Sequence, residues 1–239
     1  IRLLDVSERL PMLAEHKFSE FYTIAAKRRK SPIFKFTDEL DVVEDAANNL
    51  ARQLESFDGQ MAINTAKLEK MAMFDVLTGL PNRNMLTFQI EKQLASSIRD
   101  DRLVALMFMD LDDFKKVNDS HGHAVGDHVL KTIAGTIQNS SRNADMIFRY
   151  GGEEFVILLN KTDVAGAKIG AERIRQIIER TNISLGALKI KVTASIGVAS
   201  LCHGEDRESL LRRADKALYC AKHSGRNQVT LAEPSLANA

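Results

Sequence analysis

The sequence of 239 residues lacks the marks of several specialised protein classes. It has no tryptophan and four prolines, and its two cysteines, Cys202 and Cys220, form no CxxC motif and stand in no His/Cys cluster at zinc spacing. Disulfide scaffolds and zinc sites require cysteines at such spacings, so we expect neither. Two isolated cysteines favour a reducing compartment, and we predict a cytoplasmic location.

Long apolar runs and an excess of charge are also absent. No stretch approaches the roughly 20 apolar residues that span a bilayer, and no signal-peptide pattern opens the chain. The 33 Lys and Arg residues nearly balance the 32 Asp and Glu residues, which leaves a net charge of +1. The balance gives no whole-surface argument for binding a nucleic-acid polymer or a membrane, so an anionic ligand must be held by a local site. The chain begins at Ile1, and we expect a fragment of a longer protein.

The first 72 residues are expected to form a helix, an extended connector and a second helix. In the second helix, over residues 40–72, apolar side chains alternate at intervals of four and three. The resulting heptad seam consists of Val43, Ala47, Leu50, Leu54, Phe57, Met61, Asn64, Leu68 and Met71. A single polar residue in such a seam, here Asn64, can fix the register of a two-stranded coil. We predict an intermolecular coiled coil; the alternative is a long amphipathic helix packed against its own domain.

From Met73 onward, apolar strands alternate with amphipathic helices. "RLVALMFMD" is typical of a buried central strand, and "IFRYGGEEFVILL" predicts a hairpin with Gly151 and Gly152 at its turn. "LKIKVTASIGVAS" suggests a strand pair, and Thr78 and Pro81 are expected to begin a helix over residues 82–99. The order β-α-β-β-α-β-α-β predicts an α+β fold, with an antiparallel-centred mixed sheet covered by helices and a helical, coiled-coil-forming region before it.

Acidic residues stand at the ends of two predicted strands. Asp110 closes the first strand, and Glu153 and Glu154 follow the hairpin glycines. If the strands are neighbours, three carboxylates meet at one sheet edge, where their repulsion raises their pKa values unless a cation is bound. Oxygen ligands without nearby imidazole or thiol favour Mg²⁺, or Mn²⁺, over zinc. The alternative is a solvated acid pair at an exposed turn.

The segment "DLDDFKKVNDSHGHAVGDHVL" after the first strand carries groups suited to a purine nucleotide. Phe114 and Lys115 lie at a predicted helix start, where backbone N–H groups bind phosphate. Asn118 and Asp127 can hydrogen-bond a purine edge, and a carboxylate that accepts two N–H donors selects guanine over adenine.

Four further residues near this segment or at the end of the last helix need an interpretation. Lys222 and Arg226, in "AKHSGRN", are cations that could reach phosphates. His121 and His123 are expected on a glycine-rich loop in structural roles, because a site for a hard metal makes little use of imidazole.

Residues 73–232 resemble the GGDEF family of diguanylate cyclases. The resemblance rests on "DVLTGLPNR", "MDLDDFKKVNDSHGHAVGD", "RYGGEEF", "SIGVA" and "ADKALYCAKHSGRN", in the family's order and spacing and with its signature in the GGEEF form. It implies a palm-like nucleotidyl cyclase that converts two GTP into cyclic di-GMP and two pyrophosphates. Because each subunit binds one GTP, the resemblance also implies a homodimer, with cyclic di-GMP as product and inhibitor.

The resemblance assigns roles by position. It implies that Mg²⁺ is held by Asp110, the carbonyl of Leu111 and Glu154, and that Glu153 assists a second metal or activates the 3′-hydroxyl. Guanine would be bound by Asn118 and Asp127. The triphosphate would be held by Phe114 through its backbone, Lys115, Lys222 and Arg226. An inhibitory product site would be formed by Arg142, Asp145 and Arg173; without the resemblance, Arg142 and Asp145 could equally be a surface ion pair.

The expected domains are a HAMP-like signal-relay region over residues 1–58, a coiled-coil linker helix over 59–72, the cyclase domain over 73–232 and a tail over 233–239. The HAMP resemblance rests on two amphipathic helices, a connector and "TDEL", and departs at Asp41, where that family usually has glycine. It implies an inner-membrane receptor with a cytoplasmic cyclase. A second interpretation of the whole chain is a catalytically silent GTP or cyclic di-GMP receptor that signals through its coil.

Overall fold

The computed structural model describes Met12, Lys17 and residues 39–100 and 103–233. The expected first helix and connector therefore lie almost wholly outside the described residues, as does most of the expected tail. The chain divides into two units, Ile1–Glu69 and Lys70–Ala239. Over the described ranges, no helix combines the length and the apolar composition needed to cross a membrane.

Helix α3 (Glu39–Met73) runs unbroken for 35 residues, through the expected boundary at residue 58. Its sequence contains no proline that would interrupt the backbone hydrogen bonds. Large seam side chains are between 45% and 67% exposed, namely Val43, Leu50, Phe57, Met61 and Leu68. Exposed apolar surface of this extent is characteristic of interaction sites, which supports the predicted coiled coil without testing it.

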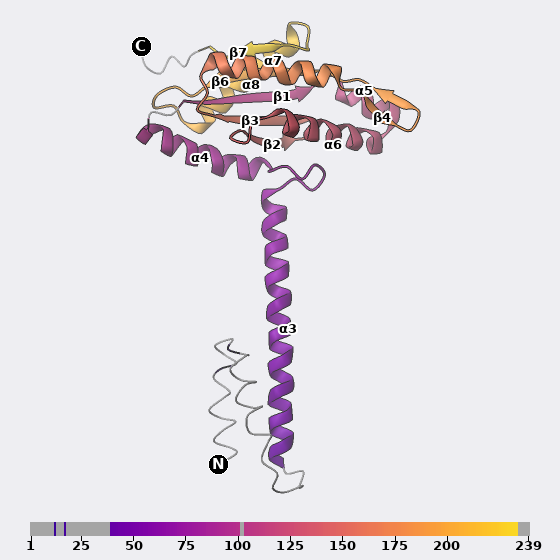
Figure 1. Ribbon diagram of the computed structural model, residues 1–239, viewed down its shortest axis with the longest axis vertical. Helices are drawn as coiled ribbons and strands as arrows, with labels where there is room; N and C mark the ends of the chain where they lie inside the picture. Colours follow the sequence, from indigo (N-terminus) through magenta and orange to yellow (C-terminus); the bar gives the residue numbers. More distant parts are fainter. Residues whose placement is uncertain (1–11, 13–16, 18–38, 101–102, 234–239) are drawn as a thin grey trace. The chain divides into compact units, whose positions relative to one another are not determined.

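The second unit contains a five-stranded sheet with helices on both faces (Figure 1). Its helices are α4 (Arg83–Asp100), α5 (Phe114–His121), α6 (His123–Ser140), α7 (Val164–Arg180) and α8 (Arg207–His223). The sheet strands are β1 (Val104–Leu111), β2 (Met146–Gly151), β3 (Glu154–Asn160), β6 (Ala194–Ser200) and β7 (Val229–Leu231). Their order is β2-β3-β1-β6-β7, antiparallel except for the parallel β6–β7 pair. The predicted α+β fold with a mixed sheet is confirmed.

The prediction that two strands within residues 188–200 pair with each other is wrong. Strand β5 (Leu188–Ile190) pairs with β4 (Ile183–Leu185), a strand that the sequence analysis missed, and the two form a separate hairpin. Strand β6 instead pairs with β1 and β7. The physical reason is burial: β6 is buried at six of its seven positions and needs partners on both edges, whereas β4 and β5 expose several of theirs.

The glycine-rich loop expected around His121 and His123 is also absent. Helix α5 ends at His121 and α6 begins at His123, so that Gly122 alone separates them. Gly122 has a φ of 82°, a conformation that costs little only for glycine. Both histidines are exposed on helix ends.

The segment "FDVLTGLPNR" folds into a hydrogen-bonded turn before α4. The N–H of Asp75 donates to the carbonyl of Leu80, and the N–H of Gly79 donates to the carbonyl of Asp75, both at 2.8 Å. The side-chain oxygen of Asn82 accepts hydrogen bonds from the N–H groups of Asn84 at 2.9 Å and Met85 at 3.2 Å. Asn82 rather than Thr78 therefore caps α4, since an N-cap side chain satisfies the free N–H groups of the first turn.

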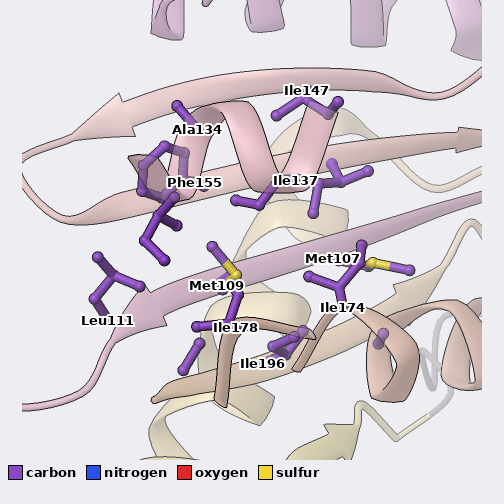
Figure 2. Packing of buried hydrophobic residues seen from close by; sticks show 14 of the residues in the cluster. Met107, Met109, Leu111, Ala134, Ile137, Ile147, Phe155, Ile174, Ile178 and Ile196 are labelled. Carbon is purple, nitrogen blue, oxygen red and sulfur yellow. The ribbon is translucent and has the colours of Figure 1, made fainter. Parts of the chain in front are cut away.

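Two apolar clusters lie on opposite faces of the sheet, and β1 contributes to both by alternation. Met107, Met109 and Leu111 belong to the cluster that includes α6 and α7, and Figure 2 shows the two methionines among isoleucines of these helices. Leu106 and Phe108 belong to the cluster that includes α4 and α8. Asp110 continues this second, even-numbered series and therefore projects toward the α8 side.

Helix α8 lies so close to β6 that position 197 admits only glycine. A Cβ atom on Gly197 would be 2.1 Å from the carbonyl oxygen of Ala214 and 2.3 Å from the nitrogen of Leu218. These separations are far shorter than van der Waals contact. Gly197 thus fixes the height of α8 above the sheet, and with it the position of Lys222 in the last turn of the helix.

Candidate active site

The two strands that carry the acids are neighbours, as expected. Asp110 on β1 is the register partner of Glu154 on β3, and the N–H of Leu111 donates to the carbonyl of Glu153 at 3.3 Å. Gly151 lies within β2, the register shifts between Arg149 and Gly151, and Gly152 has a φ of 49°. This irregular turn places Glu153 directly before β3, beside the end of β1.

Lys222 contributes a positive charge to this sheet edge. Its Nζ lies 2.7 Å from Oδ2 of Asp110, whose side chain is only 7% exposed. A buried carboxylate needs a partner of opposite charge or a strong hydrogen bond, and the ammonium provides both. Since α8 supplies the lysine and β1 the aspartate, the contact depends on the packing of α8 against the sheet.

Two acids at this edge, Asp110 and Glu154, have raised pKa values. Burial raises the pKa of Asp110 most, and the negative charges of Glu153 and Asp112 add to it, against the opposing effect of Lys222. Burial also raises the pKa of Glu154, followed by the negative charge of Asp110. The edge therefore carries more negative charge than Lys222 neutralises, which is the condition under which a further cation is stabilised.

The donors available here fit a hard cation such as Mg²⁺ or Mn²⁺. Asp110 and Glu154 present carboxylate oxygens from paired strands, and Leu111, whose carbonyl was the third predicted ligand, follows Asp110 directly. Within residues 39–100 and 103–233, no group of three or more His, Cys, Asp or Glu side chains is arranged as a metal site. The predicted ligand set requires only two such side chains together with a carbonyl oxygen, which is a chemistry that Mg²⁺ accepts.

Residues expected to bind the nucleotide lie on α5 and α6. Helix α5 begins at Phe114, as predicted, with Phe114 buried and Lys115 exposed. A Cβ atom on Gly126 would lie 1.9 Å from Oδ1 of Asn118. Glycine at this position therefore lets Asn118 lie against α6, next to the exposed Asp127. The two predicted guanine ligands are thus close in the fold.

A turn with positive φ values brings Arg226 to the start of α5. Gly225, Arg226 and Asn227 have φ values of 115°, 62° and 45°. Nε of Arg226 consequently lies 3.9 Å from Oδ1 of Asp113, the residue that precedes α5. Lys115, Lys222 and Arg226 are thereby placed around the segment that links β1 to α5, as the predicted triphosphate site requires.

Asp112, for which no role was predicted from the sequence, anchors this region. It is buried and accepts hydrogen bonds from Oγ of Ser195 at 2.6 Å, Oγ1 of Thr193 at 2.7 Å and the N–H of Asn227 at 3.0 Å. These bonds join the end of β1, the start of β6 and the turn after α8. The second acid of "DLDD", directly after a buried strand, was the available signal for it.

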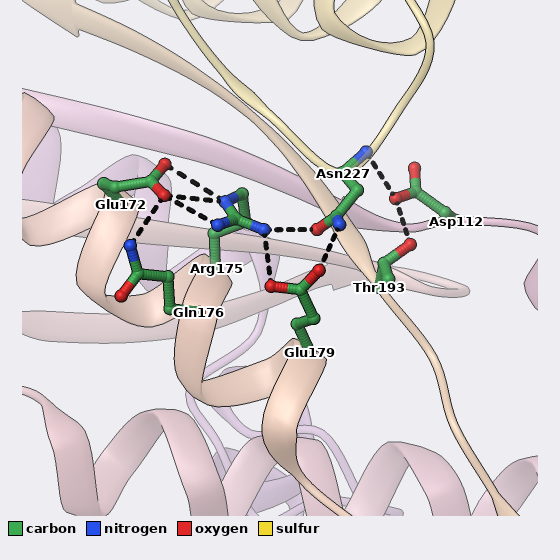
Figure 3. A network of polar contacts seen from close by, with 7 residues as sticks. All are labelled: Asp112, Glu172, Arg175, Gln176, Glu179, Thr193 and Asn227. Carbon is green, nitrogen blue, oxygen red and sulfur yellow. Dashed lines mark hydrogen bonds and ion pairs between the residues drawn. The ribbon is translucent and has the colours of Figure 1, made fainter.

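Arg175 extends the same network from α7, as Figure 3 shows. Its guanidinium contacts Glu172 at 2.7 Å, Glu179 at 3.0 Å and Oδ1 of Asn227 at 2.6 Å. The amide of Asn227 also donates to Glu179 at 2.7 Å. The strained turn that carries Arg226 is therefore held from two sides, by Asp112 and by α7.

The three residues of the predicted product site lie together, on the loop between α6 and β2 and on α7. Oδ2 of Asp145 accepts a hydrogen bond from the N–H of Arg142 at 3.1 Å, and Arg173 donates to the carbonyl of Ser140 at 2.9 Å. All three line one cavity of about 130 Å³. The fold thus assembles these residues within a single chain.

The sequence and the fold match one protein family. The family model "Diguanylate cyclase, GGDEF domain" matches residues 72–228. The chain belongs to this family, and the family assignment made from the motifs is confirmed.

Individual relatives agree with this assignment. Diguanylate cyclase A of Treponema denticola is 37% identical over 99% of this chain, which spans 62% of that relative's length. The structure of the coiled coil and GGDEF domain of DgcB from Caulobacter crescentus, in complex with c-di-GMP, has a TM-score of 0.70 and 28% identity, over 76% of this chain and 98% of that one. The active GGEEF domain of a diguanylate cyclase from Vibrio cholerae has a TM-score of 0.61 and 35% identity, over 64% of this chain and 98% of that one.

Proposed function

We propose that this chain is a diguanylate cyclase that condenses two GTP into cyclic di-GMP and two pyrophosphates. The observation that carries the proposal is the pairing of Asp110 with Glu154 across β1 and β3, with raised pKa values and with Lys222 beside them. The named relatives include a diguanylate cyclase, a cyclic di-GMP complex and an active GGEEF domain.

Asp110, Glu154 and the carbonyl of Leu111 would hold Mg²⁺, or Mn²⁺. When bound, such an ion stabilises charge on the departing pyrophosphate and lowers the pKa of the attacking 3′-hydroxyl. Glu153, in the turn, would assist this deprotonation. No protein nucleophile is required, because the chemistry is an in-line displacement at the α-phosphorus.

Other residues would orient the substrate. Lys222 exchanges Asp110 for a phosphate oxygen when GTP binds, and Lys115 and Arg226 hold the rest of the triphosphate together with the N–H groups at Phe114. Asn118 and Asp127 hydrogen-bond the guanine. Each of these groups lies on an element whose position is fixed by the packing of α5, α6 and α8.

The reaction needs two subunits, because each binds one GTP and the product contains two nucleotides. The exposed seam of α3 offers a surface for pairing with a second copy. Pairing would raise the effective concentration of one half-site at the other. We extend the proposal to a HAMP-like relay over residues 1–58, a linker helix over 59–72, a cyclase domain over 73–232 and a cytoplasmic position for that domain.

A catalytically silent receptor is the competing function, favoured by the assembled Arg142, Asp145 and Arg173, which could bind cyclic di-GMP without turnover. The deciding experiment incubates the purified chain with GTP and MgCl₂ and resolves the nucleotides by ion-exchange chromatography. A cyclase produces cyclic di-GMP, Glu153→Gln abolishes it, and the surface variant Glu208→Gln retains it. Untouched GTP at high protein concentration would favour the receptor instead.

A further inference from the structure

A second cavity, of about 400 Å³, lies between α4, the C-terminal end of α6 and β2. Ligand pockets typically measure roughly 300–1,000 Å³, so this cavity has the size of a small-molecule site. Neither of the paired acids, Asp110 and Glu154, lines this cavity. It therefore lies outside the proposed catalytic site, although Arg142 and Asp145 of the predicted product site line it.

The lining of the cavity mixes apolar and polar residues, and the apolar ones offer a surface for a flat ring. Its apolar side chains are Pro81, Met85, Met146, Ile147 and Phe148. Methionine sulfur makes favourable contacts with aromatic rings, worth about 0.3–1.5 kcal/mol each, and its flexible side chain adapts to their shape. Two thioethers on different elements, α4 and β2, thus belong to the lining, and Nε2 of Gln89 lies 3.9 Å from the sulfur of Met85.

Gln89 gives the cavity a polar requirement. Its Oε1 is buried and, among the described residues, accepts no hydrogen bond, although the residue lines the cavity. A buried acceptor without a donor costs about 1–3 kcal/mol. A ligand N–H group placed against Oε1 would remove this cost, so the cavity favours a ligand that donates a hydrogen bond.

Arg142 adds the complementary group at the rim. Its side chain is exposed and lines the cavity, and a guanidinium donates hydrogen bonds but accepts none. A ligand that contacts both residues needs a donor on one edge and an acceptor on another. We propose that this cavity binds a neutral, planar heteroaromatic molecule of the nucleobase class, held between Met85 and Met146, with an N–H group on Gln89 and a ring acceptor on Arg142.

Binding here should influence the predicted product site. Arg142 and Asp145 line both this cavity and the 130 Å³ cavity that Arg173 also lines. A ligand that engages Arg142 from the α4 side therefore competes for the guanidinium that cyclic di-GMP would use. This consequence rests on the proposed function, whereas binding itself does not; the coupling must act equally in both directions.

Adenosine is the appropriate probe. Its amino group can donate to Gln89 and its ring nitrogens can accept from Arg142, and it carries no phosphate. It also lacks the N1–H and 2-amino groups by which Asp127 would select guanine. The chain labelled with ¹³C-methyl methionine reports binding without GTP or turnover, so that failure of the cyclase proposal does not obscure the result.

The expected result is a saturable shift of the Met85 and Met146 methyl signals on titration with adenosine, with the buried core residue Met109 unchanged. Gln89→Leu, which removes the acceptor, should weaken binding about tenfold, while Gln89→Glu, which keeps an acceptor, should retain it. Adenosine should also weaken the binding of cyclic di-GMP. Absence of a saturable shift, or equal affinity in Gln89→Leu, would overturn the assignment of the site.

Discussion

Arg149 joins Asp75 although the two lie 74 positions apart in the sequence, with Nη1 of Arg149 lying 2.9 Å from both carboxylate oxygens. The same guanidinium donates from Nε and Nη2 to the carbonyl of Gly152, at 3.1 and 2.7 Å. One side chain therefore connects the turn before α4 with the turn that precedes Glu153. The carboxylate is further bound by the N–H and hydroxyl of Thr78, at 2.8 and 2.6 Å.

We expect Asp75→Asn to destabilise the domain by about 1.5–3 kcal/mol, the usual contribution of hydrogen bonds to a charged group, and to reduce turnover. Burial acts to raise the pKa of Asp75, but the hydrogen bonds from Thr78 and Arg149 outweigh it and hold the pKa below its usual value. The folded state therefore binds the carboxyl proton of Asp75 less tightly than the unfolded state does. The stabilisation by the ionised carboxylate is present at neutral pH and is lost as the pH falls through the lowered pKa.

Urea unfolding at several pH values checks this prediction, with the exposed Asp119→Asn as the control. Arg149→Lys should behave like Asp75→Asn, since an ammonium cannot bind the carboxylate and the Gly152 carbonyl with the same fork. Equal stability of Asp75→Asn and the parent at neutral pH would contradict the argument.

Replacing Leu54 and Leu68 by lysine should abolish turnover at low protein concentration and leave GTP binding near normal. Charges in the seam of α3 repel across a two-stranded coil and remove apolar contacts. Turnover per subunit as a function of concentration is the measurement. Lysine at Gln53 and Thr65, which are exposed positions of α3 outside the seam, is the matched control. Unchanged turnover per subunit in the seam variant would exclude a role of the coil.

Arg142→Ala should relieve inhibition by cyclic di-GMP by about 5- to 150-fold, since a guanidinium that binds a guanine edge contributes about 1–3 kcal/mol. Initial rates at increasing product concentration measure the effect. Arg180→Ala, which removes an exposed arginine from the end of α7, should leave inhibition by cyclic di-GMP unchanged. If both variants behave like the parent, product does not act through this loop.

Much of the fold could be predicted because hydrophobic patterning is a local property. The run before Asp110 and the glycine-hairpin pattern identified the central strands, and their acidic ends identified the site. The pairing of residues 188–200 could not be predicted in this way, because "LKI" and "ASIGVAS" differ in burial rather than in local pattern. Partner choice in a sheet depends on the whole fold.

The anchoring residues of the site were missed for a related reason. Asp112, Arg175 and Asn227 act through contacts between elements, and the bond from Asn227 to Asp112 spans 115 positions. A short sequence motif does not predict a contact between residues so far apart in the chain. Asp110 and Lys222 could be named as candidate site residues because each lies near the end of a recognisable element. The contacts of Asp112 with the hydroxyls of Thr193 and Ser195 become visible only in three dimensions.

Glu154→Gln should stabilise the domain in the absence of metal and abolish its stabilisation by Mg²⁺. Burial and neighbouring negative charge raise the pKa of Glu154, so its proton is held more tightly in the folded state. The negative charge of Glu154 therefore destabilises the folded state at neutral pH. The free energy of unfolding falls as the pH rises through the raised pKa of this carboxyl group. Single stabilising substitutions commonly contribute about 0.5–2 kcal/mol. Thermal unfolding with and without MgCl₂ measures both effects; an Mg²⁺-dependent rise that survives in Glu154→Gln would contradict the assigned ligand.

Gly197→Ala tests whether the height of α8 controls the site. The new methyl group would overlap backbone atoms of Ala214 and Leu218, and overpacking of this kind costs about 1–3 kcal/mol. The displaced helix would carry Lys222 away from Asp110, so turnover should fall even where the protein remains folded. Gly135→Ala is the control: its Cβ would meet no atom within 4 Å, and alanine in a helix interior is worth about 0.5–1 kcal/mol over glycine. That variant should gain stability and keep its turnover. Normal turnover in a folded Gly197→Ala protein would show that the position of Lys222 tolerates movement of α8, and that its contact with Asp110 is not what orients the substrate.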